Sequence, residues 1–179
     1  MRWQVLLMTA LVACVAVTGL AVQALSRVGI HQGYTPEQPI AFSHKRHAGD
    51  SRIPCLYCHF GAKTSRHAGI PPVNVCMNCH GMLRTQTREI EKLKEFVQRG
   101  QAIEWIKVHN LPDFVYFNHS QHVISGVECQ TCHGPVETMV RVEQRAPLTM
   151  GWCIQCHRSR QMVGSHTPAA NLDCGKCHY

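Results

Sequence analysis

The chain has 179 residues, and its 18 Lys and Arg against 11 Asp and Glu give a formal net charge of +7. This length allows one domain or two small ones. The charge alone would suit a nucleic-acid-binding protein, but the sequence shows neither a basic helix nor interleaved aromatic residues, so we expect no nucleic-acid partner.

The N-terminal segment has no charged residue from Trp3 to Ser26. A helix over this stretch would be about 36 Å long, which is enough to cross a bilayer. The stretch is also longer than the apolar part of a signal peptide, so we expect an uncleaved, single membrane-spanning helix within residues 1–30. Two processed forms stay open as alternatives: cleavage after the AVQA sequence that ends at Ala24, and lipidation of Cys14.

The rest of the chain carries the five-residue motif CxxCH five times. In covalent haem attachment each cysteine bonds one vinyl group of the porphyrin, and the histidine that follows binds the iron. The motif therefore predicts five covalently attached haem c groups. The thioether cysteines would be Cys55, Cys58, Cys76, Cys79, Cys129, Cys132, Cys153, Cys156, Cys174 and Cys177, and the proximal iron ligands His59, His80, His133, His157 and His178.

Other uses of paired cysteines fit this pattern less well. A zinc ribbon needs two CxxC units for one metal and no histidine directly after them. A thioredoxin-like dithiol has one CxxC unit rather than five. Structural disulfides would not explain why a histidine follows every second cysteine.

The spacing of the motifs predicts how the chain is organised. Two motifs lie in residues 31–81, which begin with a juxtamembrane linker, HQGYTPEQP, whose Gly and two prolines break regular structure. Three motifs lie in residues 109–179. Between these units, residues 82–108 are expected to form an amphipathic helix that ends at Gly100, followed by a linker.

A second repeat supplies candidate distal iron ligands. The stretches FSHKRH, from Phe42, and FNHSQH, from Phe117, both place FxHxxH ahead of a CxxCH motif, which indicates duplicated units. One histidine of each pair would bind the following haem, and the other would bind a neighbouring haem. His67 lies between the first two motifs, where it can serve the second haem. The expected distal ligands are therefore His44, His47, His67, His119 and His122.

Two axial histidines at each iron would make it low-spin and six-coordinate, a state that transfers electrons and resists substrate binding. His31, in the linker, is expected to be a surface residue. The histidines His109 and His166 and the thioether of Met150 stay open as further axial ligands.

Five porphyrins would replace much of an ordinary apolar core. We therefore expect mostly irregular chain with short α-helices, a multihaem cytochrome c fold and one N-terminal transmembrane helix. The haem propionates would add roughly −10 in charge, so the basic side chains are expected to pair with them rather than with DNA.

The FxHxxH element ahead of CxxCH resembles class III multihaem cytochromes c. Over nearly the whole chain, the stretches IPCLYCHFGAKTSRHAGIPPVNVCMNCHG, EWIKVHNLPDFVYFNHSQHV and LTMGWCIQCHRSR are similar to the pentahaem cytochrome c subunit of alternative complex III, a bacterial quinol-oxidising complex. That family is also similar to this chain in its N-terminal membrane helix, and the resemblance implies two histidine ligands at each iron.

The resemblance implies an electron-transfer subunit that is not itself an enzyme. Its partners would be polytopic quinol-binding subunits, an iron–sulfur subunit related to molybdopterin proteins, and a monohaem cytochrome c, a copper protein or an oxidase as acceptor. Since bacteria attach haem c outside the cytoplasmic membrane, the haem domain is expected on its periplasmic side. The alternative function is a periplasmic multihaem reductase of nitrite or hydroxylamine, which needs one iron with an open position.

Overall fold

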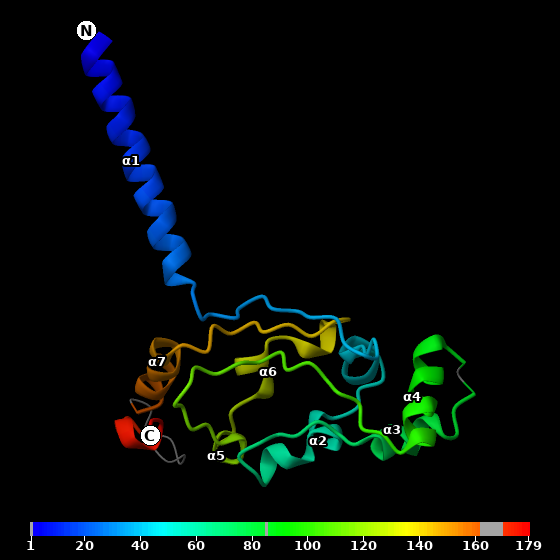
Figure 1. Cartoon of the computed structure of the whole chain (residues 1–179). Helices are drawn as coiled ribbons and strands as arrows, with labels where there is room; N and C mark the ends of the chain where they lie inside the picture. The colour runs from blue at the N-terminus through cyan, green and yellow to red at the C-terminus, as the bar shows by residue number, and fades with distance from the viewer. Residues whose placement is uncertain (1, 85, 162–169) are drawn as a thin grey trace. The chain divides into compact units, whose positions relative to one another are not determined.

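The computed structural model describes residues 2–84, 86–161 and 170–179. The chain divides into two compact units, Met1–Ile30 and His31–Tyr179, and Figure 1 shows the course of the chain in each. In the described residues the only β-type pairing is one isolated bridge, between Val115 and His178. The expectation of short helices joined by irregular chain is confirmed.

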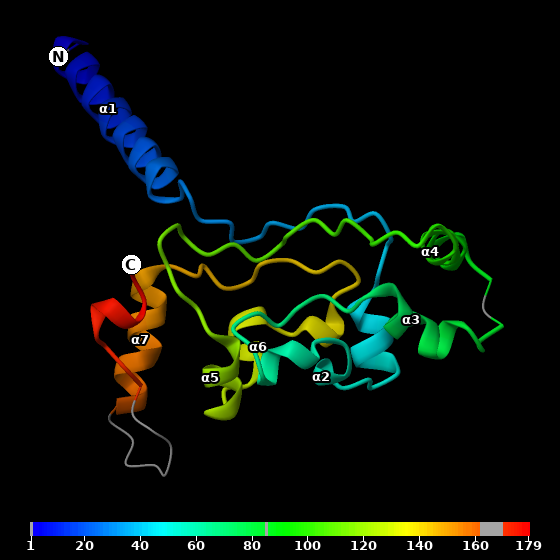
Figure 2. The ribbon, with the colours of Figure 1, turned by 60° about the horizontal axis from the view of Figure 1, so that its bottom comes forward.

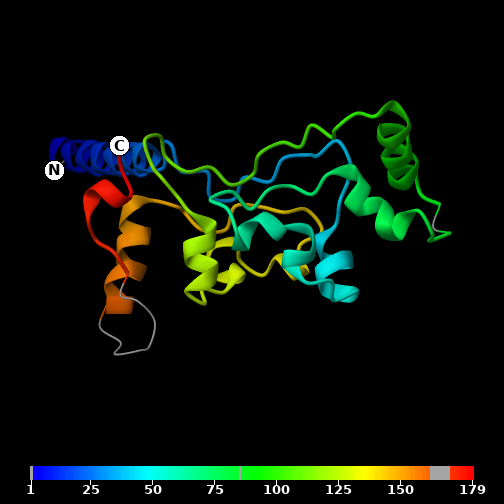
Figure 3. The ribbon, with the colours of Figure 1, turned by 90° about the horizontal axis from the view of Figure 1, so that it is seen from below.

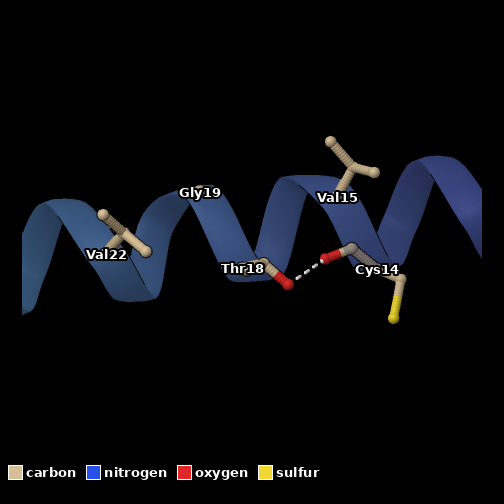
Figure 4. Close-up of a pocket in the computed structure, with 5 residues that line it drawn as sticks. All are labelled: Cys14, Val15, Thr18, Gly19 and Val22. Carbon is tan, nitrogen blue, oxygen red and sulfur yellow. Dashed lines mark hydrogen bonds between the residues drawn. The ribbon is translucent and has the colours of Figure 1, made fainter.

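The first unit contains the helix α1 (Arg2–Ser26), which is 25 residues long and apolar enough to span a membrane. None of its side chains is buried by the described chain. Gly19 leaves a shallow groove on one side, next to which the Thr18 hydroxyl donates to the Cys14 carbonyl oxygen at 2.8 Å (Figure 4). Such a bond to the preceding turn satisfies a hydroxyl that would otherwise be unpaired in lipid.

The second unit has short helices that carry the CxxCH motifs or lie close to them. They are the π-helix η1 (Lys45–Asp50), the 3₁₀-helices η2 (Phe60–Lys63), η3 (Val136–Thr138) and η4 (Cys174–Lys176), and the α-helices α2 (Cys55–Cys58), α3 (Val73–His80), α4 (Arg88–Arg99), α5 (His119–Ile124), α6 (Cys129–His133) and α7 (Met150–Gln161).

The helix predicted between the two groups of motifs is α4. Thr87 caps it, because its hydroxyl accepts from the Ile90 backbone N–H at 3.3 Å. Gly100 ends it in the left-handed conformation, with φ of 61°. Leu93 is its buried residue. The predicted C-terminus of this helix is therefore confirmed, whereas its start lies within the predicted stretch rather than at its beginning.

Three extended segments of the second unit run beside one another: residues 32–38, 103–111 and 140–146 (Figure 2). Gln144 joins all three, and its side chain is fully buried. Its backbone N–H donates to the Tyr34 carbonyl oxygen at 3.0 Å, and its Oε1 accepts from the Asn110 N–H at 2.9 Å. A buried amide with all these partners fixes the positions of segments that are far apart in sequence.

The apolar core formed by the polypeptide itself is small. Among the described residues, six apolar side chains are buried: Ile40, Ala62, Leu93, Val108, Met139 and Ala146. Many large apolar side chains are exposed, among them Phe60, Ile70 and Phe114. A unit of this size usually buries much more apolar surface, so the chain is built to pack against large apolar groups other than its own side chains.

Candidate haem-binding sites

We number the sites by their CxxCH motifs in chain order. They are site 1 (55–59), site 2 (76–80), site 3 (129–133), site 4 (153–157) and site 5 (174–178). Every motif lies on or against a short helix, and the helices of sites 1 and 2 begin directly after Pro54 and Pro72. Residues three apart share one helical face, so the two sulfurs of each motif point to the same side. All eleven cysteines are free of disulfide bonds.

Four of the five motif histidines face a second histidine ring. The ring centroids are 6.5 Å apart for His44 and His59, 6.0 Å for His47 and His80, 6.4 Å for His119 and His133, and 6.0 Å for His122 and His157. A metal–imidazole bond is about 2 Å long, so two imidazoles on opposite sides of one metal have centroids roughly 6 Å apart.

These facing pairs are the arrangement that an iron between two imidazoles requires. In the first and third pairs the rings are also nearly parallel, at 7° and 11°. The described residues contain no cluster of three or more metal-binding side chains. Two protein nitrogens per site suit a metal whose other four ligands come from a porphyrin.

Each FxHxxH element holds its two histidines with one phenylalanine. Phe42 meets His44 edge-on at 4.9 Å and stacks on His47 at 4.3 Å. Phe117 does the same with His119, at 4.8 Å, and His122, at 4.5 Å. Such ring contacts limit the rotation of an imidazole. The sequence shows the repeated phenylalanine, but only the structure gives it this role.

Most of the candidate ligands are also oriented through the ring nitrogen Nδ1. A neutral imidazole that donates Nδ1–H to a carbonyl oxygen keeps the lone pair of Nε2 for a metal. The carbonyl oxygens in question are Ser43 at 2.9 Å from His47, Gly69 at 2.8 Å from His59, Arg66 at 2.9 Å from His119, Asn118 at 2.8 Å from His122, Asn171 at 2.6 Å from His157 and Phe114 at 3.2 Å from His178.

Burial keeps several of these imidazoles neutral. Together with nearby histidines, it lowers the pKa of His44 and of His133 to about 4. Burial also lowers the pKa of His80 and His122. Because only the neutral ring can bind a metal, these surroundings favour the ligating form. Neither His44 nor His80 has a partner for Nδ1 among the described residues.

The sites follow one another along the second unit. Burial raises the pKa of Cys58, and the nearby Cys79 thiol raises it further, so sites 1 and 2 are neighbours. The same causes operate in Cys129, beside Cys55, which joins sites 1 and 3.

Two further pairs of neighbouring thiols complete the series. Burial and the nearby Cys156 thiol raise the pKa of Cys132, which joins sites 3 and 4. Burial and the Cys177 thiol raise that of Cys153, which joins sites 4 and 5. The spatial order is therefore 2, 1, 3, 4, 5. Figures 1 and 3 show the helices of these sites in this order, from α3 to the C-terminus.

Site 5 is anchored to the chain just before the second FxHxxH element. The Tyr116 N–H donates to the Cys177 carbonyl oxygen at 2.7 Å, and the Phe114 carbonyl oxygen faces His178. Phe114 has φ of 61°, a conformation that costs free energy for a residue with a side chain. No second histidine ring faces His178 within the described residues.

Some residues considered in the sequence lie elsewhere. His67, expected to serve site 2, is exposed, and no described histidine faces it; His47 lies opposite His80 instead. His166 is outside the described residues. Met150 is 61% exposed at the start of α7, and His31 is exposed beside Tyr34. His109 faces Nδ1 of His133, not its Nε2.

The residues present therefore fit haem c in three respects: paired sulfurs on short helices, facing imidazoles at the separation of a six-coordinate iron, and a small polypeptide core. The sequence predicted the sulfurs and proximal histidines. It did not reveal the carbonyl oxygens that orient the rings, nor the role of Gln144, because both depend on contacts between distant segments.

The comparisons with known proteins agree with this geometry. Residues 115–179 match the family model described as "Cytochrome c7 and related cytochrome c". The chain is also similar to the "Menaquinone reductase, multiheme cytochrome c subunit" of Nitratidesulfovibrio vulgaris strain Hildenborough. The two are 29% identical over an alignment of 163 residues, which covers 79% of this chain and 77% of that protein. In sequence, the C-terminal part of the chain is thus similar to multihaem cytochromes c, and most of its length to a cytochrome subunit of a quinone oxidoreductase.

Proposed function

We propose that this chain is the membrane-anchored pentahaem cytochrome c subunit of a quinol-oxidising complex of the alternative complex III type. The observation that carries the proposal is the set of four facing histidine pairs, with centroids 6.0 to 6.5 Å apart, arranged in series. When bound, haem c supplies an iron that takes up and releases one electron.

The residues of this chain would hold five such groups. Ten motif cysteines form the thioether bonds, and the motif histidines bind from one side. His44, His47, His119 and His122 bind from the other side of sites 1, 2, 3 and 4. His67 is exposed, and His47 already faces the motif histidine of site 2. We therefore propose His67 as a distal ligand only for site 5, and a His67→Ala variant tests this. Site 5 takes its second ligand from His67 or from solvent; His166, also considered as a ligand in the sequence, lies outside the described residues.

Filling both axial positions with imidazole favours electron transfer over substrate chemistry, since a low-spin iron changes little in geometry between oxidation states. The short helices bring neighbouring sites together, so no step requires a diffusing carrier inside this unit. This arrangement supports a role in electron transfer between a quinone-reactive membrane part and an acceptor. The helix α1 would keep the unit at the membrane, with the haem-bearing part on the periplasmic side.

The direction of electron flow separates two complexes. The similar protein from Nitratidesulfovibrio is named a menaquinone reductase subunit, whereas alternative complex III oxidises quinol. We propose quinol oxidation. Electrons would then reach this chain from polytopic quinol-binding subunits and an iron–sulfur subunit related to molybdopterin proteins. A monohaem cytochrome c, a copper protein or an oxidase would be the acceptor.

The test is purification of the full chain from its native membrane in mild detergent. We expect five haems per chain by pyridine haemochrome assay and by intact mass, together with co-purifying polytopic and iron–sulfur subunits. Adding menaquinol should reduce the haems within seconds, and an oxidised acceptor should reoxidise them. A chain without haem would end the proposal.

The same preparation distinguishes the reductase alternative. A periplasmic nitrite or hydroxylamine reductase would show a high-spin haem signal and consume nitrite or hydroxylamine without other subunits. Site 5 is the place to look for that signal, because His178 is the motif histidine with no facing histidine among the described residues. Haem reduction by an external donor followed by menaquinone reduction would instead support the opposite direction.

A further inference from the structure

Site 3 differs from the other sites in what its motif histidine contacts. Nδ1 of His133 lies 3.1 Å from Nε2 of His109, and the two rings meet edge-on with centroids 4.3 Å apart. The motif histidines of sites 1, 4 and 5 face backbone carbonyl oxygens at the same atom. Within the described chain, His133 is therefore the motif histidine whose partner is a side chain.

His109 is held in place by its neighbours in the extended segment. Val108 is buried, and the Asn110 N–H donates to Oε1 of Gln144 at 2.9 Å. Gln144 in turn donates through Nε2 to the Ala146 carbonyl oxygen at 3.1 Å. A fully buried amide with these bonds leaves the backbone on both sides of His109 little freedom.

His109 is a hydrogen-bond acceptor in this position. If His133 uses Nε2 for a metal, its Nδ1 carries the proton and donates to Nε2 of His109. His109 then carries its own proton on Nδ1, and its Nε2 is not available to a second iron.

We propose that His109 is a positioning residue for the proximal ligand His133, and that it tunes the reduction potential of the central site of the series. An imidazole nitrogen is a more basic acceptor than an amide oxygen. It therefore draws the Nδ1 proton of His133 more strongly and makes Nε2 more electron-rich. An electron-rich axial ligand stabilises the oxidised iron, which lowers the potential of site 3.

This inference rests on the proposed function, because it needs haem at site 3. Site 3 lies between sites 1 and 2 on one side and sites 4 and 5 on the other, so every electron that crosses the unit passes it. The potential set by His109 then governs how the two halves share electrons.

The experiment compares the full haem-loaded chain with the variants His109→Leu and His109→Gln by spectroelectrochemical titration and EPR. We expect His109→Leu to shift one of the redox transitions to higher potential while all low-spin signals remain. His109→Gln, which keeps an oxygen acceptor, should shift the same transition less. The matched control His31→Leu, which alters an exposed histidine, should change nothing.

Two results would overturn the inference. An unchanged titration in both variants would show that His109 does not act on the potential. A new high-spin signal in both variants would show that His109 is itself an iron ligand. If His109→Leu does not fold, His109→Gln alone decides between these outcomes. Failure of the proposed function is distinguishable, because it would appear in the unaltered chain as missing haem in the pyridine haemochrome assay.

Discussion

The two FxHxxH regions, Phe42–His59 and Phe117–His133, build nearly the same geometry from different sequences. Each stacks its phenylalanine on the second histidine, at 4.3 Å and 4.5 Å, and faces its first histidine across from the next motif histidine, at 6.5 Å and 6.4 Å. They differ in length. Cys55 follows the first histidine by eleven residues, whereas Cys129 follows it by ten.

The additional residue is absorbed in the helix. The first region forms the π-helix η1, whose end is marked by the Ser51 N–H donating to the Arg46 carbonyl oxygen at 3.1 Å. The second region forms the ordinary α-helix α5. A π-helix takes up one residue more per turn, so the histidines keep their positions. The FxHxxH element is therefore the part that keeps its geometry, and the chain after it adapts in length.

The regions also differ in how their histidines are supported. His119 donates to the Arg66 carbonyl oxygen, a group of the first half of the unit, whereas the equivalent His44 has no Nδ1 partner among the described residues. The second region is therefore oriented by contacts that the first region does not have. We attribute this to packing of α5 against η2, where the Ser120 N–H also donates to the Ser65 carbonyl oxygen at 3.1 Å.

The largest expected effect comes from removing the second histidine of each region. His47→Ala and His122→Ala should each convert one haem to high spin, because one iron loses an axial ligand while all thioether bonds stay intact. EPR and absorption spectra of the haem-loaded chain measure this. A wholly low-spin His122→Ala spectrum would contradict the pairing with His157. His67→Ala is a companion variant: if it produces the same change to high spin, His67 ligates site 5.

A large effect on stability is expected at Gly49, the residue of the first region that corresponds to Ile124 in the second. A side-chain carbon at Gly49 would run into the backbone carbonyl oxygen of Glu137, so η1 and η3 would have to separate. We expect Gly49→Ala to lower the free energy of unfolding by about 1–3 kcal/mol. Denaturant unfolding of the haem-loaded chain measures it.

The matched control for that variant is Ile124→Ala. Ile124 is 67% exposed, so its truncation should change the free energy of unfolding by less than about 0.5 kcal/mol. Equal effects of the two substitutions would mean that the two regions do not differ in their packing as described.

A smaller effect is expected at Gln144, which joins the linker to the segment that precedes the second region. Gln144→Ala leaves the half-buried Asn110 N–H without its partner. Loss of a partner of this kind costs about 1 kcal/mol where the position is only half-buried and water can reach it. Denaturant unfolding gives that number, and the titration of site 3 should shift in the direction expected for His109→Leu. A stability loss without any such shift would separate Gln144 from the positioning of His109.

The smallest effect is expected at Glu89, which joins α4 to the first region. The Ala41 backbone N–H, with Lys92, holds the pKa of Glu89 below its usual 4.5. A carboxyl group with a lowered folded pKa stabilises the protein above its unfolded pKa, and this contribution is lost as the pH falls through the folded pKa. Glu89→Gln should therefore lower the melting temperature at pH 7, by at most about 3 °C.

The pH dependence checks that prediction. Well below pH 4.5 the unaltered chain and Glu89→Gln should melt at the same temperature. Glu95→Gln, which breaks only an exposed pair with Arg99 on the same helix, should have a still smaller effect at pH 7. A constant difference between Glu89→Gln and the unaltered chain at every pH would mean that charge is not the cause.

Local pattern was enough to predict several parts of this molecule. The uncharged run from Trp3 to Ser26 predicts α1, because length and polarity alone decide whether a helix suits a bilayer. Gly100 predicts the end of α4, because helices often end at a residue in the left-handed backbone conformation and glycine adopts this conformation most easily. The histidine pair of each FxHxxH element is local as well. The placement of His67 at site 2 was not supported, since closeness in sequence says little about which rings come to face each other.

The chemistry of the sites is already present in the sequence: it shows which sulfurs and which motif histidines each site contains, and that two further pairs of histidines lie close to the motifs in the chain. Those features are set by residues a few positions apart. By contrast, the positions of His47 opposite His80, of His122 opposite His157 and of His109 beside His133 are set by tertiary packing. Such contacts join segments far apart in the chain, and they depend on how Gln144 and the carbonyl oxygens of distant loops are satisfied when the whole unit packs.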